Sequence, residues 1–316
     1  MPVFHLANDK LIQIKEKKVD LERNIQKLTE LNLETIFGLK FVSGSLNSEF
    51  SVRAQEQDFY IDTLAIDEAQ RSIVIIEYKK DKSFSVIDQG FAYLSAMLNH
   101  KADFVLEINE RLKKNFTKKD IDWEQSRIIF ISPEFTNYQR NAINFKDLPI
   151  YLYEVRLYEN DLYEFDPIKP YRTTESISSI SKDKTIQEVS REVKSLTFQD
   201  HLLKVSPDLK DLFIRLHDEL LNIGEDIKEN VTTNYVGFRF HGTNYASIAY
   251  HSGKIIFHFR TKTKPDTTLK VNKLLQSAWD KTPLWRAYIT EDAQLPQALE
   301  IARHAYRDYA DRLKKQ

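Results

Sequence analysis

The sequence contains no cysteine, and it has only 7 glycines and 9 prolines among 316 residues. The absence of cysteine excludes a disulfide scaffold, a cysteine zinc site, an iron–sulfur cluster and a cysteine nucleophile. The scarcity of glycine and proline excludes collagenous and low-complexity architectures. Any chemistry must therefore come from carboxylates, lysine, histidine, tyrosine, hydroxyl groups or a bound metal ion.

The chain also lacks an excess of charge and a long apolar run. It has 46 Lys and Arg residues against 47 Asp and Glu residues, a net charge of −1, so no domain-wide basic field indicates nucleic acid. No run approaches the roughly 18 apolar residues of a transmembrane helix, and the first ten residues lack the features of a secretory signal. We expect a soluble, cytoplasmic protein with no membrane partner. The length favours about two domains.

Residues 1–168 follow an α/β pattern in which helical and strand-like periodicities alternate. The expected helices cover 20–37, 85–99, 103–115 and 135–145, and the expected strands cover 41–42, 49–52, 59–66, 72–78, 128–131, 150–158 and 162–168. The link 67–71 is short and polar, as an antiparallel hairpin requires. This order predicts a mixed sheet flanked by helices.

Residues 169–199 are rich in Ser, Thr, Lys and Glu, and we interpret them as a linker with one surface helix near 186–195. Periodicity returns in residues 200–316, which we interpret as a smaller α+β domain. Pro207 opens a helix there and Gly224 closes it. Strands are expected at 234–241, 245–251, 254–261 and 285–290, and helices near 267–279 and 292–314.

Five polar residues of the first domain form the constellation that carries chemistry. Asp62 lies within a strand, Glu77 and Lys79 end the next strand, and Gln89 and Tyr93 lie four apart on the following helix. Residues i and i+2 of a strand share a face, so Glu77 and Lys79 point the same way, and a short hairpin brings Asp62 beside Glu77. Taken singly, each of these residues is more often a solvated surface group. Their order along the chain, and the four aliphatic residues before Glu77, favour a catalytic site.

Two neighbouring carboxylates repel each other unless a cation joins them, and Mg²⁺ prefers oxygen ligands. Lys79 can balance the negative charge of a phosphate, and Gln89 and Tyr93 share a helix face that can reach the phosphate or a catalytic side chain. The residues themselves thus favour a site for Mg²⁺, with Mn²⁺ as the alternative ion.

At these positions the sequence resembles the PD-(D/E)XK nuclease superfamily. Asp62 matches the metal-binding Asp, Glu77-x-Lys79 matches the (D/E)-x-K element, and Gln89-x-x-x-Tyr93 is similar to the helical motif of the RecB-like branch. The stretches Ile-Asp-Thr-Leu-Ala-Ile-Asp, Ile-Glu-Tyr-Lys and Asp-Gln-Gly-Phe-Ala-Tyr-Leu are similar to NucS-like endonucleases. One departure is Ile61, which stands where the superfamily name implies proline. The resemblance covers about residues 20–168.

The resemblance implies a restriction-endonuclease-like fold and Mg²⁺- or Mn²⁺-dependent hydrolysis of phosphodiester bonds, with DNA as the partner and a role in defence or repair. It implies that Asp62 and Glu77 bind the metal, with the carbonyl of Tyr78 and a helical glutamate completing the set. Glu34 is the expected helical ligand, and Glu30 is its competitor. A protein that keeps the fold but binds nucleic acid without turnover is the alternative, and a structural interaction protein is a third.

The C-terminal residues resemble an accessory domain of unknown function, through which a protein partner or a second copy of the chain could bind. Period-2 alternation places Arg239 with His241 and His258 with Arg260 on one side of their strands. A solvated face over an aromatic core is the favoured interpretation, and a nucleic-acid surface is the alternative. The lysines at 113, 114, 118 and 119 form a small basic cluster that could follow a DNA backbone but is more often a solvated helix end.

Overall fold

The computed structural model describes residues 2–17, 22–54, 57–80, 85–145, 147–170, 175–193, 196–274 and 283–313. The chain divides into two compact units. The first comprises Met1–Asp67 and Arg71–Ser195, and the second comprises Glu68–Gln70 and Leu196–Gln316. No helix among the described residues is both long and apolar enough to cross a membrane.

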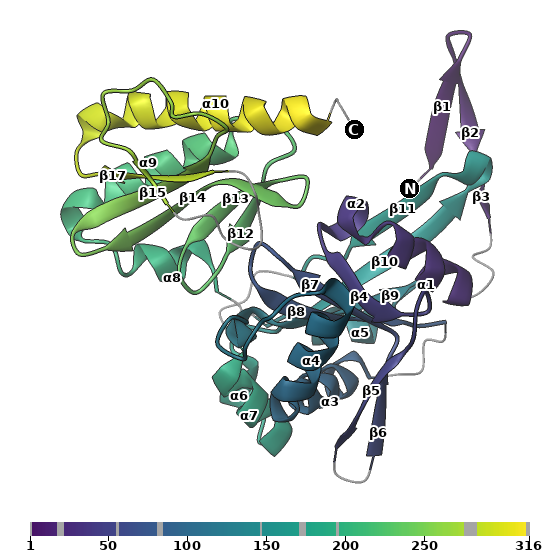
Figure 1. Ribbon diagram of the computed structural model, residues 1–316. Helices are drawn as coiled ribbons and strands as arrows, with labels where there is room; N and C mark the ends of the chain where they lie inside the picture. Colours follow the sequence, from purple (N-terminus) through teal and green to yellow (C-terminus); the bar gives the residue numbers. More distant parts are fainter. Residues whose placement is uncertain are drawn as a thin grey trace. The chain divides into compact units, whose positions relative to one another are not determined.

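The first unit is built on a seven-stranded mixed sheet, so the predicted α/β class is confirmed (Figure 1). Its strands are β3 (Glu16–Lys17), β4 (Lys40–Gly44), β7 (Thr63–Asp67), β8 (Ser72–Tyr78), β9 (Arg127–Ser132), β10 (Ile150–Tyr158) and β11 (Tyr163–Pro167). The order across the sheet is β11-β10-β9-β8-β7-β4, with β3 also paired to β10. β9 runs parallel to β8 and β10, and the remaining pairs are antiparallel.

Helices cover both faces of this sheet, so β8 is buried along its whole length. On one face, Ile25 of α1 (Glu22–Leu31) and Leu33 of α2 (Leu33–Phe37) pack into a cluster with Ile76 and Tyr78. On the other face lies α3 (Val86–Asn99), where Gly90 allows a close approach, since an added Cβ would lie 2.4 Å from the Cδ1 atom of Ile150. The packing thus sends Tyr78 towards α1 and α2, and Glu77 towards α3.

The expected strand 59–66 is divided at Asp62 into two strands of different sheets. β6 (Gln57–Ile61) pairs with β5 (Phe50–Ala54) in a two-stranded ribbon, and β7 enters the main sheet. The ribbon is anchored on neighbouring helices by edge-to-face ring contacts, Phe50 with Phe104 and Phe59 with Tyr93. A second ribbon joins β1 (Val3–Ala7) and β2 (Lys10–Ile14).

The stretch interpreted as a linker carries two helices, α6 (Ile177–Ile180) and α7 (Lys184–Glu192), which belong to the first unit. Ile177, Ile186 and Val189 are buried, so these helices add to the packing of that unit. The other short elements of the first unit are α4 (Lys101–Leu112), η1 (Trp123–Gln125), α5 (Asn137–Ala142) and η2 (Glu159–Asp161).

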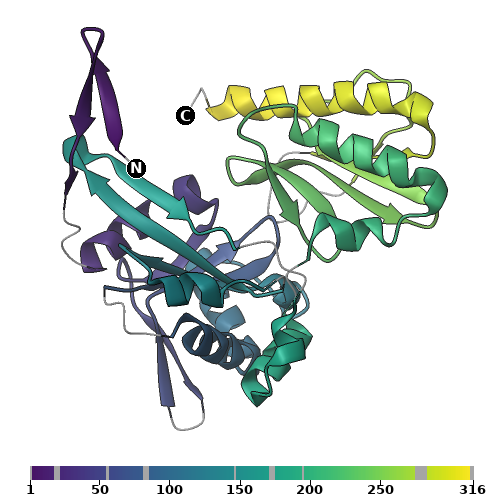
Figure 2. The ribbon, with the colours of Figure 1, turned by 180° about the vertical axis from the view of Figure 1, so that it is seen from behind.

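The second unit is an antiparallel six-stranded sheet of order β12-β13-β14-β15-β17-β16. Its strands are β12 (Lys228–Val231), β13 (Val236–Phe240), β14 (Thr243–His251), β15 (Lys254–Arg260), β16 (Asn272–Lys273) and β17 (Leu284–Ile289). The helical elements are α8 (Phe198–Leu202), η3 (Pro207–Leu209), α9 (Lys210–Leu221), η4 (Asp292–Gln294) and α10 (Leu295–Leu313). Helices α9 and α10 cover one face of the sheet, as the view from behind shows (Figure 2).

Two expectations for the second unit are wrong. The helix near 267–279 does not form in its described part, where Asn272 and Lys273 pair with β17 and the hydroxyls of Thr267 and Thr268 donate hydrogen bonds to Gln297. Residues 275–279 lie outside the described ranges. His241 does not continue β13, because it has a φ of 43° in the turn to β14.

Candidate functional site

Asp62 lies at the junction between β6 and β7, where it is tied to the end of β8. The backbone N–H of Tyr78 donates to Oδ2 of Asp62 at 3.0 Å. The side chain of Gln26 donates to the carbonyl oxygen of Asp62 at 2.7 Å. Both contacts fix the position of Asp62, and the first brings it beside the strand segment that carries Glu77.

Glu77 and Lys79 point to the same side of β8, as their spacing predicts. Nζ of Lys79 lies 3.2 Å from Oε2 of Glu77. The side chain of Glu77 is only 2% exposed, and none of the described residues donates a hydrogen bond to its Oε1 atom. A buried carboxylate oxygen without a donor is costly, so this atom is available to a cation or a proton.

The electrostatics of this pair follow from burial and from mutual repulsion. Burial, reinforced by the charge of Asp62, raises the pKa of Glu77 to about 8, although Lys79 opposes the rise. Burial also raises the pKa of Asp62, against the N–H of Tyr78, the charge of Lys79 and a hydrogen bond from Glu77. The two carboxyl groups are therefore close enough to share a proton when no cation neutralises them.

Gln89 and Tyr93 reach the same side of the sheet from α3. The helix begins at Ser85, whose hydroxyl accepts a hydrogen bond from the N–H of Asp88. The Tyr93 hydroxyl donates to the carbonyl oxygen of Tyr60 at 3.0 Å, and burial together with the charges of Glu77 and Asp62 raises its pKa. The side-chain oxygen of Gln89 is buried, and no described residue donates to it. Tyr93 therefore adjoins the carboxylates, and Gln89 holds an acceptor that lacks a donor one helical turn away.

Glu34, the expected helical ligand, is exposed on α2, and the structure does not bring it to the carboxylate pair. Its competitor Glu30 is buried at 3% exposure, on the last turn of α1. Glu30 accepts hydrogen bonds from Gln26 Nε2 (3.1 Å), Ser45 N (2.9 Å), Ser45 Oγ (2.6 Å), Leu46 N (3.1 Å) and Thr63 Oγ1 (2.7 Å). With so many donors it anchors the turn after β4 and the residue that follows Asp62.

Within the described residues, no group of three or more His, Cys, Asp and Glu side chains comes together as a metal site. The site is thus a pair of carboxylates with one ammonium group. Glu49, just before β5, was not predicted to belong to the site. Its charge raises the pKa of Asp62. Glu49 begins the expected strand 49–52, and nothing in its spacing indicates that β5 folds back towards Asp62.

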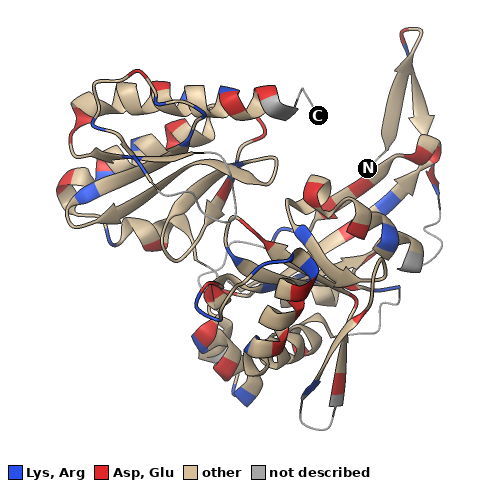
Figure 3. Ribbon diagram, viewed as in Figure 1, with Lys and Arg blue, Asp and Glu red and all other residues tan. Residues whose placement is uncertain are grey.

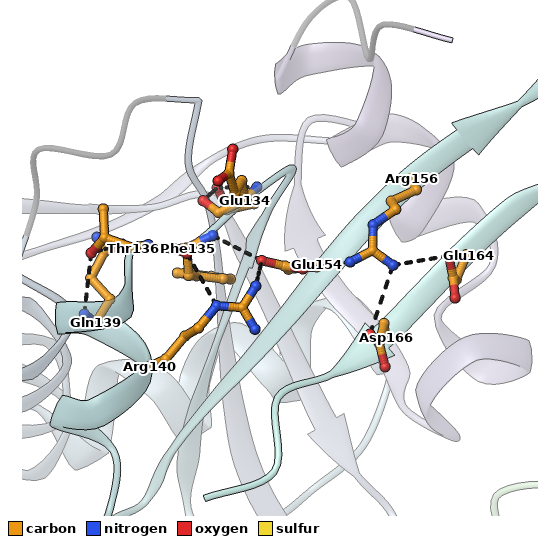
Figure 4. Close-up of polar contacts among 10 residues, drawn as sticks. Glu134, Phe135, Thr136, Gln139, Arg140, Glu154, Arg156, Glu164 and Asp166 are labelled. Carbon is orange, nitrogen blue, oxygen red and sulfur yellow. Dashed lines mark hydrogen bonds and ion pairs between the residues drawn. The ribbon is translucent and has the colours of Figure 1, made fainter. Parts of the chain in front are cut away.

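A second polar cluster gathers around Glu154 of β10 (Figure 4). Glu154 is buried between the guanidinium groups of Arg140 and Arg156, and it also accepts the N–H of Phe135 at 3.0 Å. Arg156 is shared with Glu164 at 3.1 Å and with Asp166 at 3.8 Å. Because these charges satisfy one another, we assign the cluster to the stability of the β10–β11 edge.

The predicted basic cluster surrounds the end of α4. Lys113 has a left-handed backbone and ends the helix, and the carbonyl oxygen of Lys118 accepts the indole N–H of Trp123. Lys113, Lys118 and Lys119 are exposed. Their position agrees with a solvated helix end, the more common of the two interpretations.

Among known proteins, the chain is similar to an uncharacterized protein of Haemophilus influenzae. It is 38% identical to this chain over 240 residues, which cover 76% of this chain and 77% of the relative. No family model and no solved structure matches the chain.

Proposed function

This chain belongs to the same family as that Haemophilus influenzae protein, and we propose that it is a metal-dependent nuclease of the PD-(D/E)XK type that hydrolyses phosphodiester bonds in DNA. The observation that carries the proposal is the environment of Glu77. This buried carboxylate is paired with Lys79, lies beside Asp62 and has an oxygen to which no described residue donates.

The arrangement of the first unit supports a restriction-endonuclease-like fold. Helices α1 and α2 precede the antiparallel strands β4, β7 and β8, which lead to α3 and then to β9, parallel to β8. The carboxylates lie where β7 begins and β8 ends. A carboxylate pair at the ends of two neighbouring buried strands agrees with the order of motifs in the sequence.

The residues fit a hard divalent cation such as Mg²⁺ or Mn²⁺, because both acids offer oxygen and repel each other without one. Asp62 and Glu77 would hold the ion, and the carbonyl of Tyr78 is the third proposed ligand. Bound there, such an ion supplies charge neutralisation and lowers the pKa of a coordinated water.

The remaining residues have roles that follow from their contacts. Lys79 is fixed by Glu77 at 3.2 Å, so its ammonium group is placed to stabilise negative charge on a phosphate. Tyr93 is fixed by the carbonyl of Tyr60 at 3.0 Å and lies beside Glu77, whose charge raises its pKa. Gln89 can donate its amide N–H groups to phosphate oxygens from α3.

Cleavage of a mixture of single- and double-stranded DNA in Mg²⁺ or Mn²⁺ tests the proposal. Asp62→Asn and Lys79→Ala should each lower the rate by about 100-fold or more, because the first weakens a proposed metal ligand and the second removes the ammonium group that stabilises charge in the transition state. Glu34→Gln is the matched control, since Glu34 is exposed and outside the pair, and it should cleave like the parent.

Cleavage that survives in the Asp62→Asn variant would contradict the proposal. DNA that is bound by the parent but never cut, with either metal, would favour the non-catalytic nucleic-acid-binding alternative.

A further inference from the structure

The second unit has a sheet face opposite α9 and α10 whose four central strands carry basic but no acidic residues. At the β12–β13 end, the Tyr235 hydroxyl donates to the carbonyl oxygen of Ala69, and Gln70 donates to the side chain of Asn230. The four central strands β13, β14, β15 and β17 contain Arg239, Lys254, Arg260 and Arg286 and no Asp or Glu (Figure 3). The whole chain has a net charge of −1, so this is a local concentration of positive charge.

The register of the sheet places these cations on the face opposite the helices. Phe238, Ala246, Phe259 and Trp285 are paired across the strands and belong to the core beneath the helices. Their strand neighbours therefore point outwards. The outward positions include Lys228 and Arg239 at one side, Ser247 and His258 in the middle, and Arg260, Arg286 and Tyr288 at the other.

The pKa of His258 is affected by the positive charges on this face. Its Nε2 atom accepts a hydrogen bond from Nε of Arg286 at 3.0 Å, which requires a neutral ring. Burial and the charges of Arg286 and Arg260 lower the pKa of His258 to about 4. The imidazole that contacts Arg286 is therefore uncharged, and His258 adds no negative charge to the middle of this face.

An aromatic ring lies among the cations. The side chain of Tyr288 is 39% exposed, the Nζ atom of Lys254 lies 5.5 Å from its ring centroid, and Arg286 donates to its hydroxyl at 3.4 Å. An exposed ring flanked by cations combines a stacking platform with phosphate contacts.

We propose that this face of the second unit, which we call the basic sheet face and define by Lys228, Arg239, Lys254, His258, Arg260, Arg286 and Tyr288, binds single-stranded DNA. The face runs across five strands, from β12 to β17, and at a spacing of about 4.8 Å it is about 19 Å wide, which suits a stretch of several nucleotides. A base stacks on Tyr288 while Lys254 and Arg286 contact the phosphates on either side. The binding needs no metal, so it stands independently of the proposed nuclease activity.

Fluorescence anisotropy of a labelled single-stranded oligothymidine, with the full-length chain in EDTA, tests this proposal. The double variant Lys254→Glu with Arg286→Glu should weaken binding by about tenfold or more and reduce the slope of log K against log salt by about 1.4. Lys204→Glu with Arg303→Glu is the control of equal charge change. Both control residues are exposed, Lys204 after α8 and Arg303 on α10, and this variant should keep the parent slope.

Substitutions of Tyr288 separate stacking from charge. Tyr288→Ala should weaken binding by about 5- to 150-fold, and Tyr288→Phe should restore most of it, because the ring rather than the hydroxyl stacks on a base. Ultraviolet cross-linking of the unaltered protein to the same oligonucleotide does not depend on the folding of any variant. It should attach thymine to peptides of β15 and β17.

Equal binding by the parent and the Lys254→Glu, Arg286→Glu variant would overturn the proposal, as would cross-links confined to the first unit. A variant that keeps its affinity but changes its sedimentation coefficient would reassign the basic sheet face to a protein contact. Loss of cleavage by Asp62→Asn with unchanged DNA affinity would leave both proposals standing, because the two sites are tested by different readouts.

Discussion

The backbone N–H of Tyr78, the residue after Glu77, donates to Oδ2 of Asp62 at 3.0 Å. This hydrogen bond holds the carboxylate of Asp62 beside the end of β8. This contact joins two strands at the point where their acids meet. It also explains why Asp62 keeps a fixed position although β6 and β7 belong to different sheets. The electrostatic behaviour of Glu77 depends on this proximity.

Replacing Glu77 with Gln should stabilise the metal-free protein at pH 8 relative to pH 5. The folded-state pKa of Glu77 is raised from 4.5 to about 8, so the folded state binds more protons than the unfolded state between these values. The free energy of unfolding that Glu77 contributes therefore falls as the pH rises from about 4.5 to 8. Urea unfolding of the parent and of Glu77→Gln in EDTA at pH 5 and pH 8 measures this difference. An identical pH dependence in the two proteins would contradict it.

The affinity for a divalent metal ion should rise with pH as Glu77 loses its proton, whereas the contribution of Glu77 to the free energy of unfolding falls. A cation binds deprotonated Glu77, so below pH 8 binding must release a proton, and the apparent affinity for Mn²⁺ should fall by up to about tenfold for each unit of pH. Calorimetric titrations in two buffers of different ionisation enthalpy measure the number of protons released. An affinity that is the same at pH 6 and pH 8, with no proton release, would exclude Glu77 as a ligand.

Replacing Glu30 with Ala should lower the free energy of unfolding by about 2–4 kcal/mol, because it leaves several buried donors without an acceptor. Glu34 is the exposed second residue of α2, so Glu34→Ala should change the free energy of unfolding by no more than about 0.5 kcal/mol. Urea denaturation gives both values. Equal effects of the two substitutions would mean that Glu30 is not the anchor described above.

The choice between Glu30 and Glu34 shows what the sequence could and could not predict. The periodicity of residues 20–37 predicts one helix, but α1 ends at Leu31 and α2 begins at Leu33. Asn32 interrupts the helix, with its side chain donating to the carbonyl oxygen of Leu28 at 2.8 Å. Because this break changes the phase of the helix, Glu34 faces solvent while Glu30 is buried, and no periodicity within the segment reveals the break.

The strands were more predictable than the helical ligand. Alternation within β8 correctly predicts that Glu77 and Lys79 share a side, since that rule depends only on local geometry. The division of 59–66 at Asp62 was not predictable, because both halves have strand-like composition and the break depends on pairing with β5 and β8. The proximity of Glu49 to Asp62 has the same tertiary origin.

Gly90→Ala should destabilise the first unit although alanine favours helices. The gain in helix propensity is about 1 kcal/mol, but the added Cβ would lie 2.4 Å from Cδ1 and 2.9 Å from Cγ1 of the buried Ile150. Overpacking of a core costs about 1–3 kcal/mol, so a net loss of stability is expected, with α3 displaced from the sheet. Thermal unfolding measures the sign, and a higher melting temperature would show that α3 does not pack through Gly90.

The second unit offers a titration independent of the first. His217 lies 2.6 Å from Glu229 and 2.9 Å from Asp218, and although burial lowers its pKa, these acids raise it above 6.5 overall. Protonated His217 therefore adds to the free energy of unfolding below pH 6.5, and this contribution is lost as the pH rises through the folded-state pKa of His217. NMR titration of the His217 ring should give a midpoint above 6.5 in the folded protein, and replacing Glu229 with Gln should lower it. A midpoint below 6.5 in the parent would contradict this assignment.

The most direct measurement of the central claim is anomalous scattering from a crystal soaked in Mn²⁺. We expect one manganese ion between the carboxylates of Asp62 and Glu77, within coordinating distance of both, with Lys79 beside it. Manganese bound elsewhere in the chain, with none between Asp62 and Glu77 at pH 8 or above, would contradict the claim.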